Sequence, residues 1–353
     1  MEYTGNVTGT AVNYDYRDPV AAAVVGVLTV VGMFGNALVV YIVARYRDMH
    51  NITNIYVSNL AKTDICFLVC CAVPAALQLA DGGVWTLGDF MCRFAVYMQS
   101  VTVQATCGTL TIMTMDRCFV IFNPLKARML RTKRKVWITI VVIWIISFAM
   151  HTPVVMFYGA AFDPYSNTSV CTYFFDEQRD MNIYTVYEAL VMYAIPLIII
   201  IACNVAIAVK ICTMEMPAKL RKTAGKVGGG APELDGRAMS KPAQESASQK
   251  VRVTVIVFII VIFFAICWGP VHATRIFMIV KQQYNNLLLF KLSKISLCLT
   301  YLNSALNPVL YAFLGKNYRA HAKHVFCCAN YSQNNSSYSQ ISTTRKRIST
   351  TVM

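Results

Sequence analysis

Long apolar stretches separated by polar segments dominate this chain. A bilayer core about 30 Å thick is crossed by about 20 apolar helical residues. Six stretches of that length contain no charged residue, and a seventh, Asn54–Leu79, carries Lys62 and Asp64 near its start. The pattern therefore predicts an all-α membrane protein, a seven-transmembrane helix bundle over residues 19–315. The six stretches without Asp, Glu, Lys or Arg are Pro19–Ala44, Phe94–Met115, Val136–Phe162, Ala189–Val209, Val253–Thr274 and Ile295–Gly315.

The charges of the polar segments predict the orientation. The loop Asn123–Lys135 and the segment after the last span carry Lys and Arg but no acid, whereas the segments on the other side are mostly acidic. The positive-inside rule then places the N-terminus outside and the C-terminus in the cytoplasm of a multi-pass plasma-membrane protein. The net charge of +15 would suggest nucleic acid in a soluble protein, but 56% of residues are hydrophobic. We expect contact with membrane lipid and no nucleic acid.

Polar segments flank and interrupt the bundle. Residues 1–18 lack the apolar core of a signal peptide, so we expect an extracellular N-terminus and a first span that serves as its own signal anchor. The third inner loop, about 215–249, contains Gly228-Gly229-Gly230 and indicates a flexible linker. Residues 316–328 are predicted as a short amphipathic eighth helix. Residues 329–353, rich in Ser, Asn and Thr, are predicted as a disordered cytoplasmic tail.

The outer segments hold candidate modification sites. Most of the 13 cysteines lie within spans, where a free thiol packs as a small hydrophobic group. Cys92 and Cys171 are the pair that falls in outer segments, and we predict one disulfide between them. Asn6 and Asn167 begin N-x-S/T sequons on the same side and are predicted glycosylation sites.

Short polar and proline motifs occur at defined places in the spans. Together, in this order and on these spans, they strongly resemble the rhodopsin-like (class A) G-protein-coupled receptors over about residues 20–326. The motifs are Gly35-Asn36, Asn59-Leu60-Ala61-Lys62-Thr63-Asp64, Asp116-Arg117-Cys118, Trp144, Pro196, Cys267-Trp268-Gly269-Pro270 and Asn307-Pro308-Val309-Leu310-Tyr311.

Two of these motifs predict a conformational switch. Proline inside a helix removes a backbone hydrogen bond and bends the helix, so Pro270 and Pro308 can form hinges. Prolines that only shape packing are the alternative. The resemblance implies that Trp268 is the packing trigger below the ligand pocket, and that Asn307 and Tyr311 belong to the switch with Pro308.

Buried oxygen atoms suggest an ion site. An ionisable side chain inside a membrane helix is by default a functional hypothesis, and Asp64 is one. The family resemblance implies a buried sodium ion that stabilises the inactive state. A neutral, hydrogen-bonded Asp64 is the alternative, and no other cofactor is expected. The oxygens that can join Asp64 come from Asn36, Thr106, Asn303, Ser304 and Asn307.

The inner end of span three resembles a G-protein coupling site. In the family, Arg117 would be held by its neighbour Asp116 at rest and would swing toward the G protein on activation, and Leu125 would insert into the G-protein groove. The chain departs from the family at Cys118, where Tyr is usual, and at Asn204, where span five usually carries Tyr. The second departure puts in doubt one hydrogen bond thought to stabilise the active state.

Several ligand classes are disfavoured. Tyr301 stands where opsins need their retinal-binding Lys, and Gln99 stands where amine receptors have an Asp. No nucleophile–base pair or metal-spaced cluster supports an enzyme. A transporter or channel is disfavoured because the spans show one buried acid and no paired broken helices.

Local sequence points to a peptide ligand. Cys92-Arg93-Phe94 and Gln104-Ala105-Thr106-Cys107 are similar to kisspeptin receptors, while galanin and allatostatin-A receptors share the general frame. The resemblance implies an amidated neuropeptide that ends in Arg-Phe-amide, and Gq, phospholipase C and calcium signalling. A galanin- or allatostatin-like peptide is the alternative.

Glu188 is the acid in the upper half of span five. We hypothesise that it pairs with the Arg of the peptide and that Gln99 binds the terminal amide. Internal pairing of Glu188 with His272 or Arg275 is the alternative. The remaining predicted ligand-site residues are His272, Arg275, Tyr301 and Trp268.

The tail carries candidate regulatory sites. Cys327 and Cys328 are candidates for palmitoylation, with two unmodified cysteines as the alternative. We expect receptor kinases to phosphorylate the Ser/Thr cluster for arrestin binding. Arg345-Lys346-Arg347-Ile348-Ser349 suits a basophilic kinase, and Thr351-Val352-Met353 suits a PDZ protein.

Overall fold

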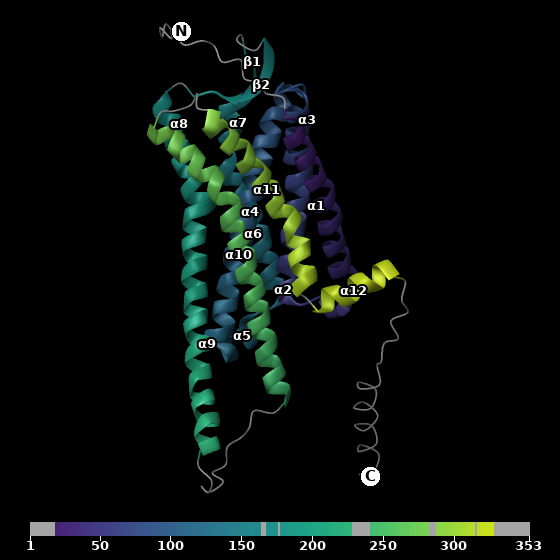
Figure 1. Ribbon diagram of the computed structural model, residues 1–353, viewed down its shortest axis with the longest axis vertical. Helices are drawn as coiled ribbons and strands as arrows, with labels where there is room; N and C mark the ends of the chain where they lie inside the picture. The colour runs from purple at the N-terminus through teal and green to yellow at the C-terminus, as the bar shows by residue number, and fades with distance from the viewer. Residues whose placement is uncertain are drawn as a thin grey trace.

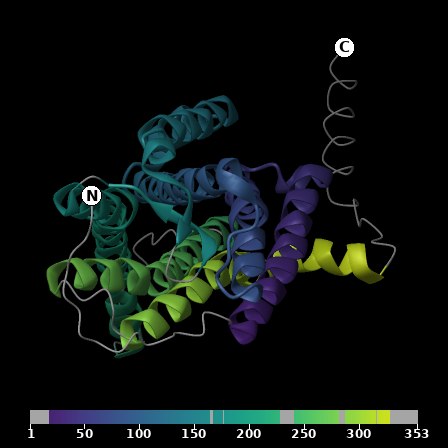
Figure 2. The same cartoon turned by 90° about the horizontal axis from the view of Figure 1, so that it is seen from above.

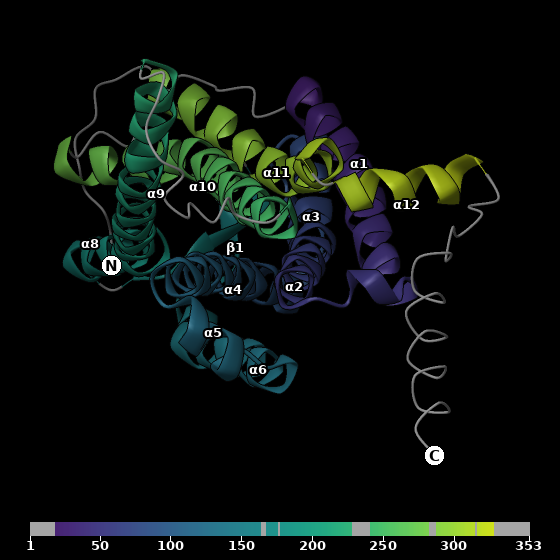
Figure 3. The same ribbon diagram turned by 90° about the horizontal axis from the view of Figure 1, so that it is seen from below.

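The computed structural model describes residues 18–163, 167–175, 177–227, 241–281, 287–314 and 316–327. Long helices lie side by side in a bundle (Figure 1), which Figures 2 and 3 show from its two ends. By length and composition, six helical stretches can cross a membrane, and α11 (Leu287–Leu314) adds a further long helix of 28 residues. The predicted seven-helix fold class is confirmed. The six stretches are Pro19–Arg45, Ile52–Ala80, Gly88–Phe122, Lys133–Phe157, Gln178–Ile211 and Val257–Lys281.

Two of the crossing units contain a π-helical turn, η2 and η3, each joined directly to its α-helices. The crossing units are α1 (Pro19–Arg45), α2–η2–α3 (Ile52–Phe67, Leu68–Ala72, Val73–Ala80), α4 (Gly88–Phe122), α6–α7 (Lys133–His151, Val154–Phe157), α8–η3–α9 (Gln178–Ala189, Leu190–Ala194, Ile195–Val227), α10 (Lys241–Lys281) and α11. The connecting elements are η1 (Arg47–Met49), α5 (Pro124–Leu130), β1 (Tyr158–Asp163), β2 (Thr168–Tyr173) and α12 (Lys316–Cys327).

The two ends of the bundle differ in structure. A hairpin of β1 and β2 covers one end, and α5 lies at the other, where α12 turns away from the bundle axis (Figure 1). Following the predicted topology, we call the hairpin end the outer end and the opposite one the inner end. Helix α4 contacts α2, α6, α9 and α10, so it runs through the middle of the bundle (Figure 3).

Close approach of α1 and α11 depends on glycine. A Cβ atom at Gly35 would lie 2.8 Å from Cβ of Pro308, nearer than real Cβ contacts come. One turn earlier, a Cβ at Gly32 would lie 3.3 Å from Cα of Ala305. Glycine therefore lets α1 pack directly against the proline of α11 that the sequence predicts as a hinge.

The hairpin is tied to the outer end of α4. Its antiparallel strands pair Ala160 with Cys171, and the predicted disulfide between Cys171 and Cys92 is confirmed, with Cα atoms 5.6 Å apart. Asp89 accepts a hydrogen bond from the Ala160 N–H at 2.8 Å and forms an ion pair with Arg93 at 2.7 Å. These contacts fix the hairpin above the bundle.

Two predicted boundaries differ from the structure. The apolar stretch Val136–Phe162 does not form one helix, because α6 ends at His151, Pro153 follows, and the chain becomes strand β1 at Tyr158. The predicted inner loop, about 215–249, is helical in its first and last parts, since α9 continues to Val227 and α10 begins at Lys241. Residues 218–226 are rich in Ala, Lys and Arg, which are good helix formers.

Candidate functional site

A charged cluster joins α8 to α10 near the outer end. Arg275 donates from Nη1 to Oε2 of Glu188 at 3.0 Å, and the hydroxyl of Tyr184 donates to Oε1 at 2.9 Å. Tyr184 lies one helical turn before Glu188, so both side chains share one face of α8. Of the two internal partners considered for Glu188, the structure shows Arg275. The Nε2 atom of His272 has no hydrogen-bond partner among the described residues.

Aromatic rings of the hairpin, of the residues that flank it and of α8 form a wall at this end. Phe157 and Phe175 stack with centroids 4.8 Å apart, and Phe175 lies 5.7 Å from Tyr184. Tyr158 and Tyr173 meet edge to face at 6.1 Å across the two strands. Burial raises the pKa of Tyr158 to about 12, so this hydroxyl is neutral at physiological pH. The rings of this wall present apolar faces, and its tyrosines also have hydroxyls that can donate hydrogen bonds.

One level deeper, Tyr193 connects the π-helical turn η3 to α10. Its ring stacks on His272 at 5.1 Å and its hydroxyl donates to the carbonyl oxygen of Ala265 at 3.0 Å. A Cβ at Gly269 would lie 2.9 Å from that hydroxyl oxygen, so glycine beside Pro270 makes room for it. Tyr193 thus bonds to the backbone next to the proline kink.

The same π-helical turn is bonded to α4. The thiol of Cys107 donates to the carbonyl oxygen of Met192 at 2.8 Å. A π-helical turn leaves a backbone carbonyl free for such an external partner. The turn therefore links α4 on one side and α10 on the other.

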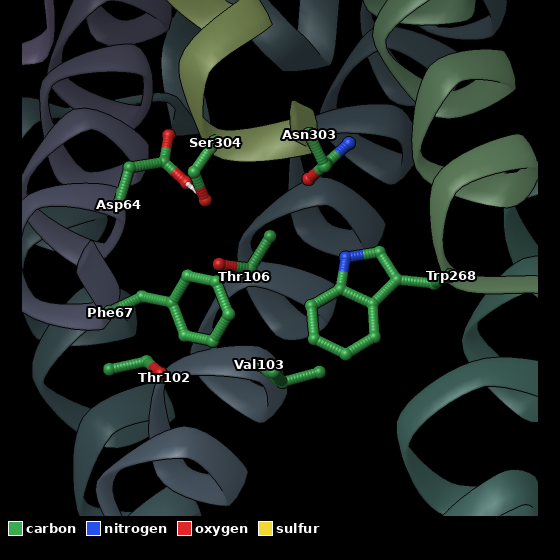
Figure 4. A pocket seen from close by; sticks show the side chains of 8 residues that line it. All are labelled: Asp64, Phe67, Thr102, Val103, Thr106, Trp268, Asn303 and Ser304. Carbon is green, nitrogen blue, oxygen red and sulfur yellow. Dashed lines mark hydrogen bonds between the residues drawn. The ribbon is translucent and has the colours of Figure 1, made fainter. Parts of the chain in front are cut away.

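Trp268 lines a small cavity in the middle of the bundle (Figure 4). The cavity volume is about 10 Å³, close to the least that holds one water molecule. Phe67 separates Trp268 from Tyr301, with ring centroids 6.0 Å and 5.3 Å away. The residues around the cavity are Asp64, Phe67, Thr102, Val103, Thr106, Trp268, Asn303 and Ser304.

The two other predicted ligand residues differ in position. Gln99 is half-buried on α4. Tyr301 is only 1% exposed, and its hydroxyl donates to the carbonyl of Cys71 at 3.5 Å. This is the position of a packing residue, and it gives no support to the prediction that Tyr301 contacts a ligand.

Asp64 is the acidic residue among those that line the cavity. Both of its carboxylate oxygens accept hydrogen bonds, from Ser304 Oγ at 2.7 Å and Asn307 Nδ2 at 2.8 Å. Thr106 and Asn303 line the same space, and Asn36 lies behind Ser304, donating to its carbonyl at 3.0 Å. A carboxylate, hydroxyls and amide oxygens are ligands that hard cations prefer, so the residues fit the predicted sodium ion. The same bonds also fit a hydrogen-bonded Asp64 without an ion.

At the inner end, Asp116 does not hold its neighbour Arg117. Both of its oxygens accept from Arg131, the residue after α5, at 2.6 Å and 2.7 Å. Arg117 is buried, and its Nε atom has no hydrogen-bond partner among the described residues. The expected resting contact is therefore replaced by a fork between α4 and the inner loop. Leu125 lies on the same loop and is 81% exposed.

Asn204 and Cys118, the two residues that depart from the family pattern, both lie toward this end. Asn204 is buried and donates back to the carbonyl of Ile200 on its own helix at 3.0 Å. Cys118 is half-buried. Tyr311 stacks on Tyr318 of α12 at 6.0 Å, and its hydroxyl has no partner in the described part of the chain.

Comparison with known proteins identifies the family. The profile of the 7 transmembrane receptor (rhodopsin family) matches residues 35–311. This chain belongs to the rhodopsin family of seven-transmembrane receptors. The human KiSS-1 receptor is 34% identical to it over 309 residues, 86% of this chain and 73% of the relative. G-protein coupled receptor 54 of Oreochromis niloticus is 32% identical over 304 residues, 85% and 76%. The allatostatin-A receptor of Bombyx mori is 29% identical over 307 residues, 86% and 78%. The receptor is a signalling protein and not an enzyme.

Some contacts of the receptor's functional residues can be predicted from the sequence, and others cannot. The spacing of Tyr184 and Glu188 was a usable sign of contact, since residues four apart on a helix are neighbours. Nothing in the sequence marked Arg131 as the partner of Asp116, or Tyr193 as a bond to α10.

The predicted modification sites are only partly visible. Asn167 lies exposed at the tip of the hairpin with a left-handed φ of 53°. Cys327 is the last residue of α12. Asn6, Cys328 and the tail motifs lie outside the described residues, and the modifications themselves stay predictions.

Proposed function

We propose that the receptor binds a kisspeptin-like amidated neuropeptide ending in Arg-Phe-amide, and that it activates Gq, phospholipase C and calcium release. The identity to KiSS-1 receptors supports the subfamily, because it exceeds the identity to the allatostatin-A receptor. In this proposal Glu188 binds the guanidinium of the peptide's Arg and Gln99 binds its terminal amide.

The observation that carries the proposal is the environment of Glu188. Its side chain is 9% exposed, and it accepts one bond from a guanidinium and one from a hydroxyl. A buried carboxylate needs charged or hydrogen-bonding partners, and arginine matches its geometry better than lysine. The aromatic rings of Phe157, Phe175 and Tyr184 supply a surface for the terminal Phe.

The first test is intracellular calcium in cells that express the receptor. Amidated kisspeptin-, galanin- and allatostatin-like peptides are added in turn. A nanomolar response to Arg-Phe-amide peptides alone supports the ligand and Gq together. A response to another peptide keeps the receptor class and gives the alternative ligand, and ion flux without any peptide would favour a channel.

Glu188→Gln tests the binding residue. The substitution removes the charge and keeps the shape, so potency should fall at least about tenfold, the loss of about 1.4 kcal/mol. Glu177→Gln is the matched control, because Glu177 is 62% exposed and pairs with Arg179 just before α8. An unchanged dose–response curve for Glu188→Gln would remove Glu188 from the site.

We also propose a sodium ion beside Asp64, held with oxygens of Ser304, Thr106 and Asn303. Bound sodium would favour the inactive arrangement, so it should weaken agonist binding. Titration of sodium against peptide affinity in membranes tests this, and Asp64→Asn should abolish the sodium dependence. Binding of arrestin, receptor kinases and a PDZ protein to the tail remains part of the proposal.

A further inference from the structure

We propose that Arg275 is a displaceable internal occupant of the peptide's Arg site. Its guanidinium holds the Glu188 carboxylate in the free receptor, and the guanidinium of the arriving peptide takes its place. The inference rests on the proposed function for its natural ligand. It makes Arg275 a residue that sets affinity and specificity by competition.

The occupant has the same chemical group as the proposed ligand. The contact between Arg275 Nη1 and Glu188 Oε2 at 3.0 Å is a guanidinium–carboxylate bond. The structure therefore shows directly that this carboxylate accepts a guanidinium in its present surroundings. A peptide Arg needs no new kind of site, only the one that Arg275 fills.

Burial of the two partners is unequal, and this permits exchange. The side chain of Glu188 is 9% exposed, whereas that of Arg275 is 42% exposed. A buried carboxylate without a cation is strongly unfavourable. Glu188 therefore needs a partner at all times, whereas Arg275 can turn to water when it is released. Exchange leaves neither charge buried and unpaired.

The contact geometry also favours exchange. Arg275 makes one hydrogen bond to Glu188, and the other carboxylate oxygen is taken by the rotatable hydroxyl of Tyr184. A bidentate fork would resist replacement more strongly. Only one hydrogen bond has to be given up when the peptide arrives, and Tyr184 stays in place to orient the carboxylate.

Release of Arg275 from Glu188 changes the connection between two helices. The exchange breaks a bond between α8 and α10, the helix that carries Pro270. Ligand arrival thereby frees the outer end of the hinge helix.

Chemical rescue tests the site without any peptide. The thermal unfolding of the purified full-length receptor in detergent is measured for wild type and Arg275→Ala, with and without ethylguanidinium. Arg275→Ala should lower the unfolding temperature, and ethylguanidinium should restore most of the loss. It should do nothing for wild type or for Arg275→Ala combined with Glu188→Gln. Arg275→Gln is the replacement if the alanine variant does not fold.

Two results of this experiment would overturn the inference. One is the absence of rescue in a folded Arg275 variant. The other is equal rescue in the variant that also lacks the Glu188 charge, which would mean general stabilisation by the salt. Ethylammonium at the same concentration serves as the control for charge without guanidinium geometry.

A peptide experiment then tests competition. If Arg275 occupies Glu188 in most wild-type receptors, the peptide binds only the fraction in which Glu188 is free. Removing Arg275 raises the apparent affinity for the peptide by the inverse of that fraction. Arg275→Gln should therefore bind an Arg-Phe-amide peptide about tenfold more tightly than wild type. A peptide with citrulline in place of Arg should gain nothing, because it brings no cation. An equal loss for both peptides would make Arg275 a structural residue and overturn the exchange.

The two proposals fail in different ways. A wild-type receptor that is expressed but ignores every Arg-Phe-amide peptide removes the proposed function, while ethylguanidinium rescue still decides whether Glu188 accepts an external guanidinium. A receptor that responds to the peptide but shows no rescue and no gain in Arg275→Gln keeps the function and loses the exchange.

Discussion

Two acid–arginine pairs, one near each end of the bundle, are built differently. At the outer end Arg275 reaches Glu188 through one hydrogen bond, and the arginine is 42% exposed. At the inner end Arg131 donates two hydrogen bonds to Asp116, of 2.6 Å and 2.7 Å. Both side chains are largely buried, Arg131 at 23% and Asp116 at 14% exposure. Both ion pairs therefore join a guanidinium to a carboxylate, but the inner pair has one more hydrogen bond and its arginine is more buried.

The difference matches what each end has to do. A single bond to a partly exposed arginine is exchanged for a ligand more easily than a bidentate fork, which fixes the geometry of both side chains. The inner fork keeps Asp116 away from Arg117, so Arg117 is not held by its neighbour. The weaker Glu188–Arg275 pair suits an end that exchanges partners with a ligand. The firmer Asp116–Arg131 pair suits an end whose geometry has to stay fixed.

The largest effect is expected from Cys171→Ser, which breaks the outer end alone. The disulfide ties the hairpin to α4, and Phe157 and Phe175, which flank the hairpin, contact Tyr184 beside Glu188. Peptide potency should fall about a hundredfold, which corresponds to about 2.7 kcal/mol. Basal signalling per receptor at the surface should be unchanged, because the inner pair is intact.

Calcium release and surface labelling measure these two quantities. Cys298→Ser is the control, since Cys298 is a free, half-buried cysteine of α11. A parallel loss of basal and peptide-driven signalling at normal surface level would show that the two ends are not separable.

Arg131→Gln breaks the inner pair and should have the next largest effect. Asp116 is then free to bind Arg117, which the fork prevents. Maximal G-protein activation should fall about five- to tenfold, a difference of about 1–1.4 kcal/mol, while peptide affinity stays the same. Nucleotide exchange in membranes and peptide binding measure the two. Arg128→Gln, an exposed neighbour on α5, is the control. Reduced peptide affinity with intact coupling would contradict the separation of the ends.

A smaller effect is expected at the link between the ends. Tyr193→Phe removes the hydroxyl that bonds to the Ala265 carbonyl and keeps the ring. A hydrogen bond contributes about 1 kcal/mol, or about fivefold. The increase in peptide affinity that the G protein causes should therefore shrink by about that factor, because coupling between sites is reciprocal. Tyr187→Phe is the control. An unchanged increase would mean that coupling bypasses Tyr193.

The sequence predicted the helices far better than the contacts between them. Apolar length alone locates the spans, because a membrane helix must satisfy its own backbone. The two cysteines in outer segments were sufficient to predict the disulfide. By contrast, the sequence left two internal partners open for Glu188, and Arg275 lies 87 positions away from it. The choice between His272 and Arg275 depends on how α8 and α10 are rotated. The span-four boundary was missed because hydropathy does not distinguish the apolar start of β1 from helix.

The smallest effect is expected for an acid–lysine pair at the outer rim. Asp18 accepts from the Ala21 N–H at 2.9 Å as the N-cap of α1, and pairs with Lys294 of α11 at 3.2 Å. The backbone bond to Ala21, helped by Lys294 and opposed by partial burial, lowers the pKa of Asp18. Asp18→Asn removes the charge but keeps an oxygen that can cap the helix, so it isolates the pair, which should contribute less than about 1 kcal/mol.

The sign of the pH dependence follows from the lowered pKa. A carboxylate whose folded pKa lies below its unfolded pKa stabilises the protein fully above the unfolded value, and loses this as pH falls through the folded value. The difference in unfolding temperature between wild type and Asp18→Asn should therefore be the same at about pH 7.4 and pH 5.5, and should vanish only below about pH 4. If the difference instead vanished between about pH 7.4 and 5.5, the charge on Asp18 would not be its source. The rim would then differ from the two acid–arginine pairs in kind, not only in strength.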